Sequence, residues 1–327
     1  MNILLTGVAG FIGFNVAKAL LDRGDVVIGI DNLNDYYDVN LKKARLAQLE
    51  ARNGFTFERA DIADRGAIFG IVDRHPEITG VVHLAAQAGV RYSLENPFAY
   101  IDSNVMGQVV MLEASRRLKS CDSFVYASSS SVYGGNTKRP SSVEDRVDSP
   151  VSLYAATKRG CELIAHSYCH LYGMTCTGLR FFTVYGPWGR PDMAAYLFTD
   201  AIMAGRPIKI FNEGKMARDF TYIDDIVRGT IAALDRRPGV QAPGNRHRVY
   251  NLGNHRPEQL LEFIAVLEKA LGRTAQKELL PMQPGDVAES YADIDASRRD
   301  LGFEPTTPIR VGLPRFVEWY KAYHRIG

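Results

Sequence analysis

The amino-acid sequence predicts an α/β protein in which a doubly wound parallel sheet is followed by a smaller mixed α/β domain. Over residues 1–181, short apolar stretches with strand character alternate with stretches of helical periodicity, the pattern of a parallel sheet with helices on both faces. After Phe181 the alternation ends in a loop rich in Gly and Pro at residues 185–191. A chain of 327 residues is long enough for a large domain and a smaller one. We therefore expect the first domain over residues 1–181 and the second mainly over residues 182–327.

The strands predicted in the first domain are rich in β-branched and aromatic residues, as expected for strands that are buried on both faces. Between them, a helix is predicted over residues 11–23, with Gly24 as its stop, and another over residues 97–118. The predicted strands span residues 3–6, 26–31, 56–59, 80–84, 123–128 and 175–181.

The second half of the chain contains two elements that we expect to return to the main sheet. They are a helix over residues 223–235 and a strand over residues 249–252. A further helix is predicted over residues 257–271, where apolar residues recur at helical spacing until Gly272.

Charge and composition exclude several classes of partner. The 39 basic residues nearly balance the 37 acidic ones, so neither a nucleic acid nor a membrane is predicted as the main partner. No stretch approaches the roughly 18 apolar residues of a membrane helix, and residues 1–7 run into a glycine-rich turn without a basic leader. The four cysteines have no C-x-x-C spacing, which favours reduced thiols in a soluble, cytoplasmic protein. His166 and His170 stand four residues apart without an acidic residue in ligand register, so no metal site is predicted.

A glycine pattern joins the first predicted strand to the first predicted helix. Gly7 permits the tight turn, Gly10 lets the backbone approach a diphosphate, and Gly13 allows close packing of helix and strand. The helix start at Phe11 and Ile12 then offers free N–H groups to the anion. In this context the pattern is typical of a Rossmann-type dinucleotide site.

An acidic residue at the end of the second strand specifies the dinucleotide. The carboxylate of Asp31 accepts hydrogen bonds from an adenosine ribose and repels a 2′-phosphate, so NAD is predicted rather than NADP. For Asp61, a helix N-cap is an alternative reading. The other residues that we expect at the cofactor follow strand ends and are Asn32, Asp61, Ile62, Leu84, Ala85 and Ala86.

Tyr154 and Lys158 stand four residues apart and therefore share one helix face. The lysine ammonium stabilises a phenolate, which makes the phenol a better general base. This helix follows a run of serines at residues 128–131, at the end of a predicted strand. Hydroxyl, phenol and ammonium are thus expected to meet above the edge of the sheet.

These motifs, together with residues 218–225, resemble the extended short-chain dehydrogenase/reductase family over nearly the whole chain. The resemblance implies that Tyr154 is the catalytic base and acid, and that Lys158 tunes it and holds the nicotinamide ribose. It also implies that a hydroxyl, best matched by Ser129, hydrogen-bonds the sugar, and that NAD stays bound and is regenerated in each turnover. Family members usually form homodimers through the helices expected here at residues 97–118 and 154–172.

The residues before Val132 narrow the reaction within the family. Related dehydratases carry Asp-Glu there and related UDP-glucuronate decarboxylases carry a Glu, whereas this chain has Ser130 and Ser131. The resemblance therefore implies a UDP-sugar 4-epimerase. The segments at residues 31–38, 86–93, 180–193 and 282–287 resemble UDP-glucuronate 4-epimerases more closely than UDP-galactose epimerases. A decarboxylase, or an epimerase of the UDP-glucose/UDP-galactose type, remains an alternative.

The sequence contains candidate ligands for both ends of such a substrate. The candidates for a sugar carboxylate are Thr183, Arg190, Arg91 and the hydroxyls of Ser129, Ser130 and Ser131. For each arginine, a solvated ion pair at the surface is the alternative. At the nucleotide end the resemblance implies that Phe211 stacks on uracil and that Arg218 binds the diphosphate, with Asp286 a further ligand. A buried core position is the alternative for Phe211. We accordingly expect residues 1–181 to form the NAD-binding domain, joined by 223–253, and 182–327 to be mainly the UDP-sugar-binding domain.

Overall fold

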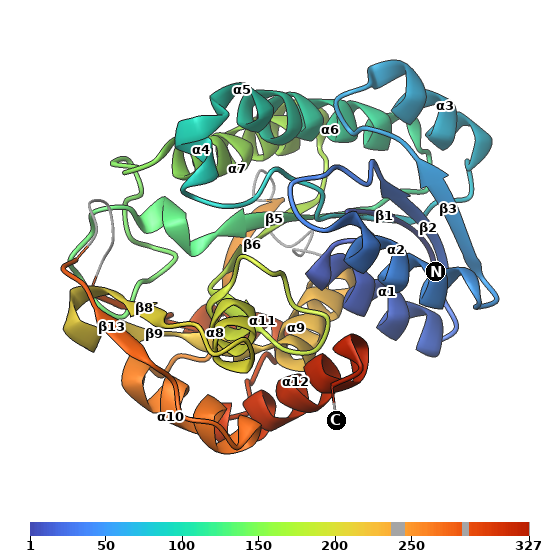
Figure 1. Cartoon of the computed structure of the whole chain (residues 1–327). Coiled ribbons are helices and arrows are strands. Elements are labelled where there is room, and N and C mark those ends of the chain that lie inside the picture. Colours follow the sequence, from blue (N-terminus) through green and yellow to red (C-terminus); the bar gives the residue numbers. More distant parts are fainter. Residues whose placement is uncertain (237–245, 283–287, 327) are drawn as a thin grey trace.

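The computed structural model describes residues 1–236, 246–282 and 288–326. At its centre lies a seven-stranded sheet in the order β11-β6-β5-β4-β1-β2-β3 (Figure 1). All neighbouring strands in this sheet are parallel. The strands are β1 (Asn2–Thr6), β2 (Val26–Asp31), β3 (Phe55–Arg59), β4 (Gly80–His83), β5 (Ser123–Ser129), β6 (Cys176–Phe181) and β11 (His247–Leu252).

The strand order reverses beside β1. From β1 the chain builds outward through β2 and β3 on one side, and through β4, β5 and β6 on the other. The carboxyl ends of β1 and β4 therefore border a switch point, which is where sheets of this type bind ligands. Ile3 to Leu5 in β1 and Val81 to Val82 in β4 are completely buried, as expected for strands covered on both faces.

Two layers of helices cover the sheet, and Figure 1 shows them on opposite sides of it. On one face, buried residues of α1 and α9 pack in one cluster with β1 and β5. On the other face, α3, α6 and α7 pack against β2, β4 and β5 in a second cluster. The predicted doubly wound α/β fold is therefore confirmed. The helices of the two layers are α1 (Phe11–Asp22), α2 (Val39–Glu50), α3 (Arg65–Arg74), α6 (Gly107–Arg117), α7 (Leu153–Tyr172) and α9 (Ile223–Asp235).

The two elements predicted to return to the main sheet do so. The helix over 223–235 is α9, and β11 pairs in parallel with β6, with Leu252 opposite Phe181. The division of the chain into two domains at residue 181 stays a prediction.

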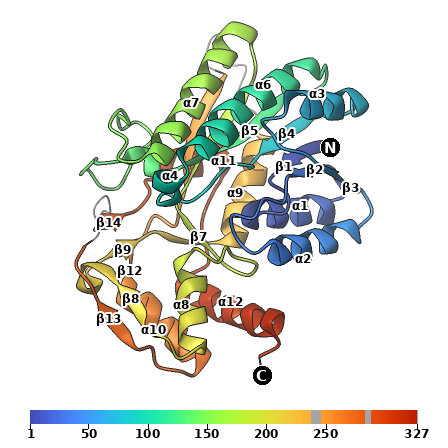
Figure 2. The same ribbon diagram turned by 45° about the horizontal axis from the view of Figure 1, so that its top comes forward.

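A smaller mixed α/β region lies beside the carboxyl ends of the sheet, as Figure 2 shows for α8, α10 and α12. It contains small sheets, β7–β10, β12–β9–β14 and β8–β13, of which only the pairing of β12 with β9 is antiparallel among the described strands. The elements are β7 (Thr183–Tyr185), α8 (Ala194–Met203), β8 (Ile208–Ile210), η3 (Phe211–Gly214), β9 (Ala217–Arg218), β10 (Phe220–Tyr222), β12 (Glu258–Gln259), α10 (Leu260–Leu271), β13 (Lys277–Leu279), β14 (Glu289–Ser290), α11 (Asp295–Leu301) and α12 (Ile309–His324).

Two predicted helices differ from the observed ones. The helix expected from residue 257 begins at Leu260, because Glu258 and Gln259 pair with β9 instead. It ends as predicted, with Gly272 in the left-handed conformation.

The helix expected over residues 97–118 is interrupted by a π-helical segment. It consists of α5 (Pro97–Tyr100), the π-helix η1 (Ile101–Met106) and α6, and a short helix α4 (Tyr92–Glu95) precedes it. The π-helix turns the side chain of Asn104 into the protein, where it bonds to Gln87 and Thr157. Such insertions occur frequently at functional sites, and this one lies next to the cleft described below.

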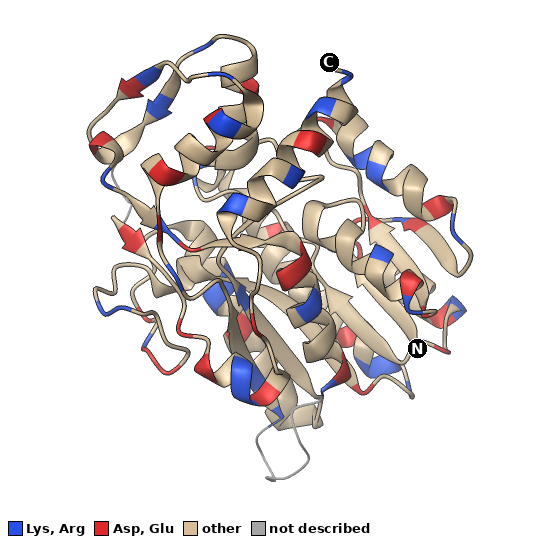
Figure 3. Ribbon diagram, turned by 90° about the horizontal axis from the view of Figure 1, so that it is seen from below, with Lys and Arg blue, Asp and Glu red and all other residues tan. Residues whose placement is uncertain are grey.

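Charged residues are interspersed over the outer helices and loops, with both signs mixed in the view of Figure 3. Among the described residues, no helix has the length and the apolar character needed to cross a membrane.

Candidate active site

A cleft of about 1160 Å³ opens at the carboxyl ends of the sheet strands, between the sheet and the smaller region. Its volume slightly exceeds the usual range for a small-ligand site, as expected for a site that takes two ligands. Its walls come from the glycine turn after β1, the ends of β2, β4 and β5, the start of α7, and the loop and strands from Phe181 to Phe220.

The glycine turn fits the diphosphate of a dinucleotide. Gly7 has φ +75°, and a Cβ atom placed on it would lie 2.8 Å from the backbone nitrogen of Ala85. A Cβ atom on Gly13 would lie 2.0 Å from the carbonyl oxygen of Gly7, so the helix can approach the turn this closely only because residue 13 is glycine. Gly10 is the N-cap of α1, which directs the first N–H groups of that helix to the cleft.

Asp31 lies at the end of β2 and lines the cleft. Its two carboxylate oxygens accept hydrogen bonds from the backbone N–H groups of Leu33 (2.8 Å) and Ala9 (3.1 Å). Burial raises the pKa of Asp31, against the lowering effect of these bonds and of the charges of Lys42 and Arg45. Each oxygen has a second lone pair for a ribose hydroxyl, so the residue fits its predicted role.

The remaining residues predicted at the cofactor divide into two groups. Phe11, Ile12, Asn32, Ile62, Leu84, Ala85 and Ala86 line the cleft. Asp61 is not among the lining residues, although its neighbour Ala60 is. The Asp61 carboxylate accepts hydrogen bonds from Asn32 (2.8 Å) and from the N–H of Ala63 (2.9 Å), and the N-cap of α3 is Asp64 instead. Asp61 thus orients Asn32, which faces the cleft.

The three predicted catalytic residues line the same cleft. Ser129 ends β5, and Tyr154 and Lys158 lie on the first turns of α7, which begins at the N-cap Ser152. The buried Lys158 ammonium donates to the carbonyl oxygen of Ala127 (3.0 Å). Ser129 Oγ donates to Ser131 Oγ and accepts from the Ser131 N–H, both at 3.1 Å. A hydroxyl, a phenol and an ammonium are therefore brought to one place by a strand end and a helix start.

Two buried groups that the sequence analysis did not identify support this arrangement. Asn104 joins the loop at Gln87 to the Thr157 hydroxyl on α7. Glu162, one turn after Lys158, accepts from Ser128 (2.6 Å) and forms a buried bidentate pair with Arg180 of β6. Glu162 stands four residues after Lys158 and therefore on the same face of α7. This spacing is the signal by which the sequence could have placed Glu162 near the site.

The predicted ligands of the substrate also lie around the cleft. Thr183, Ser130 and Ser131 line it, and Arg190 lies there in a bidentate ion pair with Asp192 (2.6 and 3.0 Å). Burial alone would raise the pKa of Asp192, but the charge and hydrogen bonds of Arg190 hold it below its usual range.

Arg91, predicted as a ligand of the sugar carboxylate, lies beside Phe211, which is predicted at the nucleotide end, and Arg218 lines the same cleft. The Arg91 guanidinium lies 5.5 Å from the ring centroid of Phe211, and both line the cleft. Phe211 is half-buried at the cleft wall, so the core alternative for it does not hold. Arg218 Nη1 donates to the carbonyl oxygens of Ala217 and Ala288. Asp286 lies outside the described residues.

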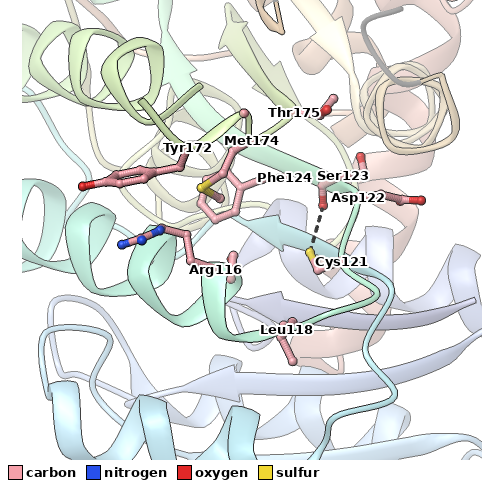
Figure 4. A pocket seen from close by; sticks show the side chains of 11 residues that line it. Arg116, Leu118, Cys121, Asp122, Ser123, Phe124, Tyr172, Met174 and Thr175 are labelled. Atoms are coloured by element: carbon pink, nitrogen blue, oxygen red, sulfur yellow. Dashed lines mark hydrogen bonds between the residues drawn. The ribbon is translucent and has the colours of Figure 1, made fainter. Parts of the chain in front are cut away.

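A second hollow, of about 380 Å³, lies at the opposite edge of the sheet, where β5 and β6 begin. Figure 4 shows Arg116 beside Tyr172 on one side of it and Cys121 bonded to Ser123 on the other. Burial raises the pKa of Cys121 to about 11, so its thiol is a poor nucleophile. Nowhere in the described part of the chain do three or more His, Cys, Asp or Glu side chains form a group that could hold a metal ion.

The fold and the cleft together define a Rossmann-type enzyme of the extended short-chain dehydrogenase/reductase class. The chain belongs to the NAD dependent epimerase/dehydratase family, whose model matches residues 3–253.

Named relatives are similar over almost the full length of the chain. It is 50% identical to UDP-glucuronate 4-epimerase 4 of Arabidopsis thaliana, covering 99% of this chain and 76% of the relative. It is 48% identical to a probable UDP-glucuronate 4-epimerase of Rhizobium meliloti (strain 1021), covering 99% and 98%. The crystal structure of the UDP-glucuronic acid 4-epimerase from Bacillus cereus, in complex with UDP-glucuronic acid and NAD, has a TM-score of 0.89 at 36% identity, covering 99% and 100%.

Proposed function

We propose that this protein is an NAD-dependent 4-epimerase that interconverts UDP-glucuronate and UDP-galacturonate. The observation that carries the proposal is the composition of the cleft. Tyr154 and Lys158 share it with three consecutive serines and with the Arg190 cation. The named relatives and the Bacillus cereus complex support the same substrate.

The residues of the chain handle the proton and the oxygen at the sugar carbon C4. Bound NAD supplies the exchange of a hydride with C4. The Tyr154 phenolate takes the proton of the 4-hydroxyl, and the resulting phenol returns it to the 4-keto oxygen after the sugar has turned over. Lys158, fixed by the Ala127 carbonyl, favours the phenolate by its charge, and the Ser129 hydroxyl hydrogen-bonds the same sugar oxygen.

The serine run explains why the reaction stops at epimerisation. Elimination of water needs an additional acid and base, and positions 130 and 131 offer hydroxyls in their place. Ser129, Ser130, Ser131 and Thr183 can hydrogen-bond the sugar, and Arg190 matches a carboxylate in charge and planar geometry. A 4-keto uronic acid is a β-keto acid that readily loses CO₂, so a fixed carboxylate serves the epimerase.

The nucleotide end of the substrate is assigned to the smaller region. Phe211 offers a ring face for uracil, and Arg218 offers a cation for the diphosphate. Arg91 adds a second cation beside Phe211. Asp286 is proposed as a further ligand on the resemblance alone.

We further propose a homodimer. Leu94 and Phe98 are 80% and 76% exposed, and Ile101 and Leu163 are also exposed. These side chains belong to α4, α5, η1 and α7, which pack against one another. Exposed apolar groups on adjacent elements are typical of an interface. The proposed compartment is the cytoplasm, which is consistent with four free cysteines.

The test is to incubate the purified protein with UDP-glucuronate, without added cofactor, and to follow the sugar by proton NMR. We expect UDP-galacturonate of unchanged mass to appear up to an equilibrium, without release of NADH or CO₂. The Tyr154→Phe variant should lose roughly 10²- to 10⁴-fold in rate. A UDP-pentose product would identify a decarboxylase, and conversion of UDP-glucose alone would identify an epimerase of neutral sugars.

A further inference from the structure

Arg190 is held by a series of hydrogen-bonded side chains that leads to the cofactor half of the molecule. Its Nε donates to Asp192 Oδ1 (3.0 Å) and its Nη2 to Asp192 Oδ2 (2.6 Å). Asp192 Oδ2 also accepts from the hydroxyl of Tyr36 (3.1 Å), which is 156 residues away in the sequence. All three residues line the cleft.

The ion pair occupies one edge of the guanidinium. Among the described residues, Arg190 Nη1 takes part in none of the hydrogen bonds, which use Nε and Nη2. The planar guanidinium of an arginine can donate to two carboxylates on different edges, because its five N–H donors point in fixed directions. Asp192 thus fixes the plane of the guanidinium and leaves the Nη1 side for a ligand.

Tyr36 is itself in a fixed position. It lies in the loop between β2, which ends at Asp31, and α2. A Cβ atom on Gly89 would lie 2.2 Å from the Tyr36 hydroxyl, and the Tyr92 ring lies 5.0 Å from the Tyr36 ring. Burial, together with the negative charge of Asp192, raises the pKa of Tyr36 to about 12, so its hydroxyl remains a donor at neutral pH.

A second link joins the loop that carries Arg190 to the cofactor half. Arg45 on α2 is completely buried and donates to the carbonyl oxygen of Ala9 in the glycine turn (2.9 Å) and to that of Trp188 (2.6 Å). It also donates to the hydroxyl of Tyr37 (2.8 Å). The loop that carries Arg190 is therefore anchored to the cofactor half at two points, through Tyr36 in the β2–α2 loop and through Arg45, which also holds the glycine turn.

We propose that Asp192 and Tyr36 are positioning residues that aim Arg190 at the carboxylate of the sugar and so set the preference for a uronic acid. This inference rests on the proposed function. Asp192 fixes the guanidinium, and Tyr36 fixes Asp192. The selected ligand is the hexuronate of a nucleotide sugar, as opposed to the same sugar with a neutral hydroxymethyl group.

The same contact protects the 4-keto stage. Loss of CO₂ breaks the C5–C6 bond, leaves the electron pair on C5 as the enolate of the 4-ketone, and adds a proton at C5. During this step negative charge leaves the carboxylate. A cation held on the carboxylate stabilises the state before the loss more than the transition state, and therefore slows it.

The experiment compares Asp192→Asn and Tyr36→Phe with the wild type and with the matched control Tyr92→Phe. The Tyr92 ring packs on Tyr36, but its hydroxyl bonds to Asn96 instead of Asp192. Calorimetry gives the affinities for UDP-glucuronate, UDP-glucose and UDP, and NMR gives the ratio of UDP-pentose to UDP-galacturonate formed. Bound NAD is quantified in every variant.

We expect Asp192→Asn to weaken UDP-glucuronate binding roughly tenfold and Tyr36→Phe roughly threefold, with UDP and UDP-glucose affinities and bound NAD unchanged. The share of turnovers that end in UDP-pentose should rise in both variants and stay at the wild-type level in Tyr92→Phe.

Two other outcomes overturn the proposal in different ways. In the first, the wild type prefers UDP-glucuronate, and both variants either keep this preference and the product ratio or lose as much affinity for UDP as for UDP-glucuronate. The positioning role is then wrong, and the proposed function stands. In the second, the wild type binds UDP-glucuronate no better than UDP-glucose and does not convert UDP-glucuronate. The proposed function then fails, and the positioning role fails with it.

Discussion

Two arginine–carboxylate pairs near the active site have the same chemistry and different surroundings. The side chains of Arg180 and Glu162 are 3% and 1% exposed, whereas those of Arg190 and Asp192 are 24% and 30% exposed. Both pairs are bidentate. Burial, rather than pairing, thus separates a group that holds the structure from a group that can bind a ligand.

The buried pair has further protein partners. Glu162 also accepts from Ser128 and Arg159, and Arg180 also donates to the hydroxyl of Tyr133, which donates to Asn251. These bonds connect α7, which carries Lys158, with β5, which ends at Ser129, and with β6 and β11. In the half-buried pair, the hydrogen bonds to Asp192 use Nε and Nη2 of Arg190 and leave Nη1 for a ligand.

The largest expected effect is on folding stability. Glu162→Gln leaves the buried Arg180 charge without its carboxylate, which should lower the free energy of unfolding by about 3–5 kcal/mol. Asp192→Asn, in the half-buried pair, should change it by about 0–1 kcal/mol. Denaturant unfolding of the NAD-loaded protein measures both.

A double replacement provides the control for this difference. Glu162→Met combined with Arg180→Met removes both charges together, and should recover a large part of the lost stability. Equal, small losses for Glu162→Gln and Asp192→Asn would mean that burial does not separate the two pairs.

The second prediction concerns the lysine variants of the two arginines. Lysine keeps the charge but cannot bind two carboxylates with one planar group. Arg190→Lys should therefore weaken UDP-glucuronate binding by roughly 1.5–3 kcal/mol, with the free energy of unfolding changed by less than about 1 kcal/mol. Arg180→Lys should instead reduce stability first.

Calorimetry with UDP-glucuronate, and with UDP as the ligand that lacks the sugar, separates these effects. Unchanged UDP-glucuronate affinity in Arg190→Lys would show that the sugar carboxylate binds elsewhere. Thr183 and the serines at 129–131 would then be its remaining candidate ligands.

The two pairs also show what the sequence reveals and what it does not. The glycine turn, Asp31 and the pair Tyr154 and Lys158 are local patterns, and regular strand spacing was enough to predict the doubly wound fold. Asp192 stands two residues after Arg190, so the pairing was accessible from the sequence, but its bond to Tyr36 spans 156 residues. No local periodicity encodes such a contact.

Other features were missed for similar reasons. The π-helix at residues 101–106 was predicted as regular helix, because helical periodicity does not distinguish one inserted residue. Its consequence, an inward-facing Asn104, depends on α7 and on the loop at Gln87. Asp61, predicted at the cofactor from its position after β3, does not line the cleft itself, and its carboxylate accepts a hydrogen bond from Asn32, which does.

The smallest expected effect is a pH dependence. Burial raises the pKa of Glu162, but the hydrogen bonds and the charge of Arg180 outweigh it and hold the pKa below its usual value of 4.5. A carboxyl group whose pKa is lowered by folding adds stability that is complete above its unfolded pKa, and this stability is lost as the pH falls through the folded pKa.

The stability difference between the wild type and Glu162→Gln should therefore be constant above about pH 5 and shrink below it. The pKa of Asp192 is also lowered, from its usual value of 3.8, so the difference between the wild type and Asp192→Asn should be smaller and should begin to shrink only at the lowest pH of the series. Denaturant unfolding at pH 4 to 8 measures both differences. A difference for Glu162→Gln that grew as the pH fell would mean that folding raises the pKa of Glu162, and that the effect of burial outweighs that of Arg180.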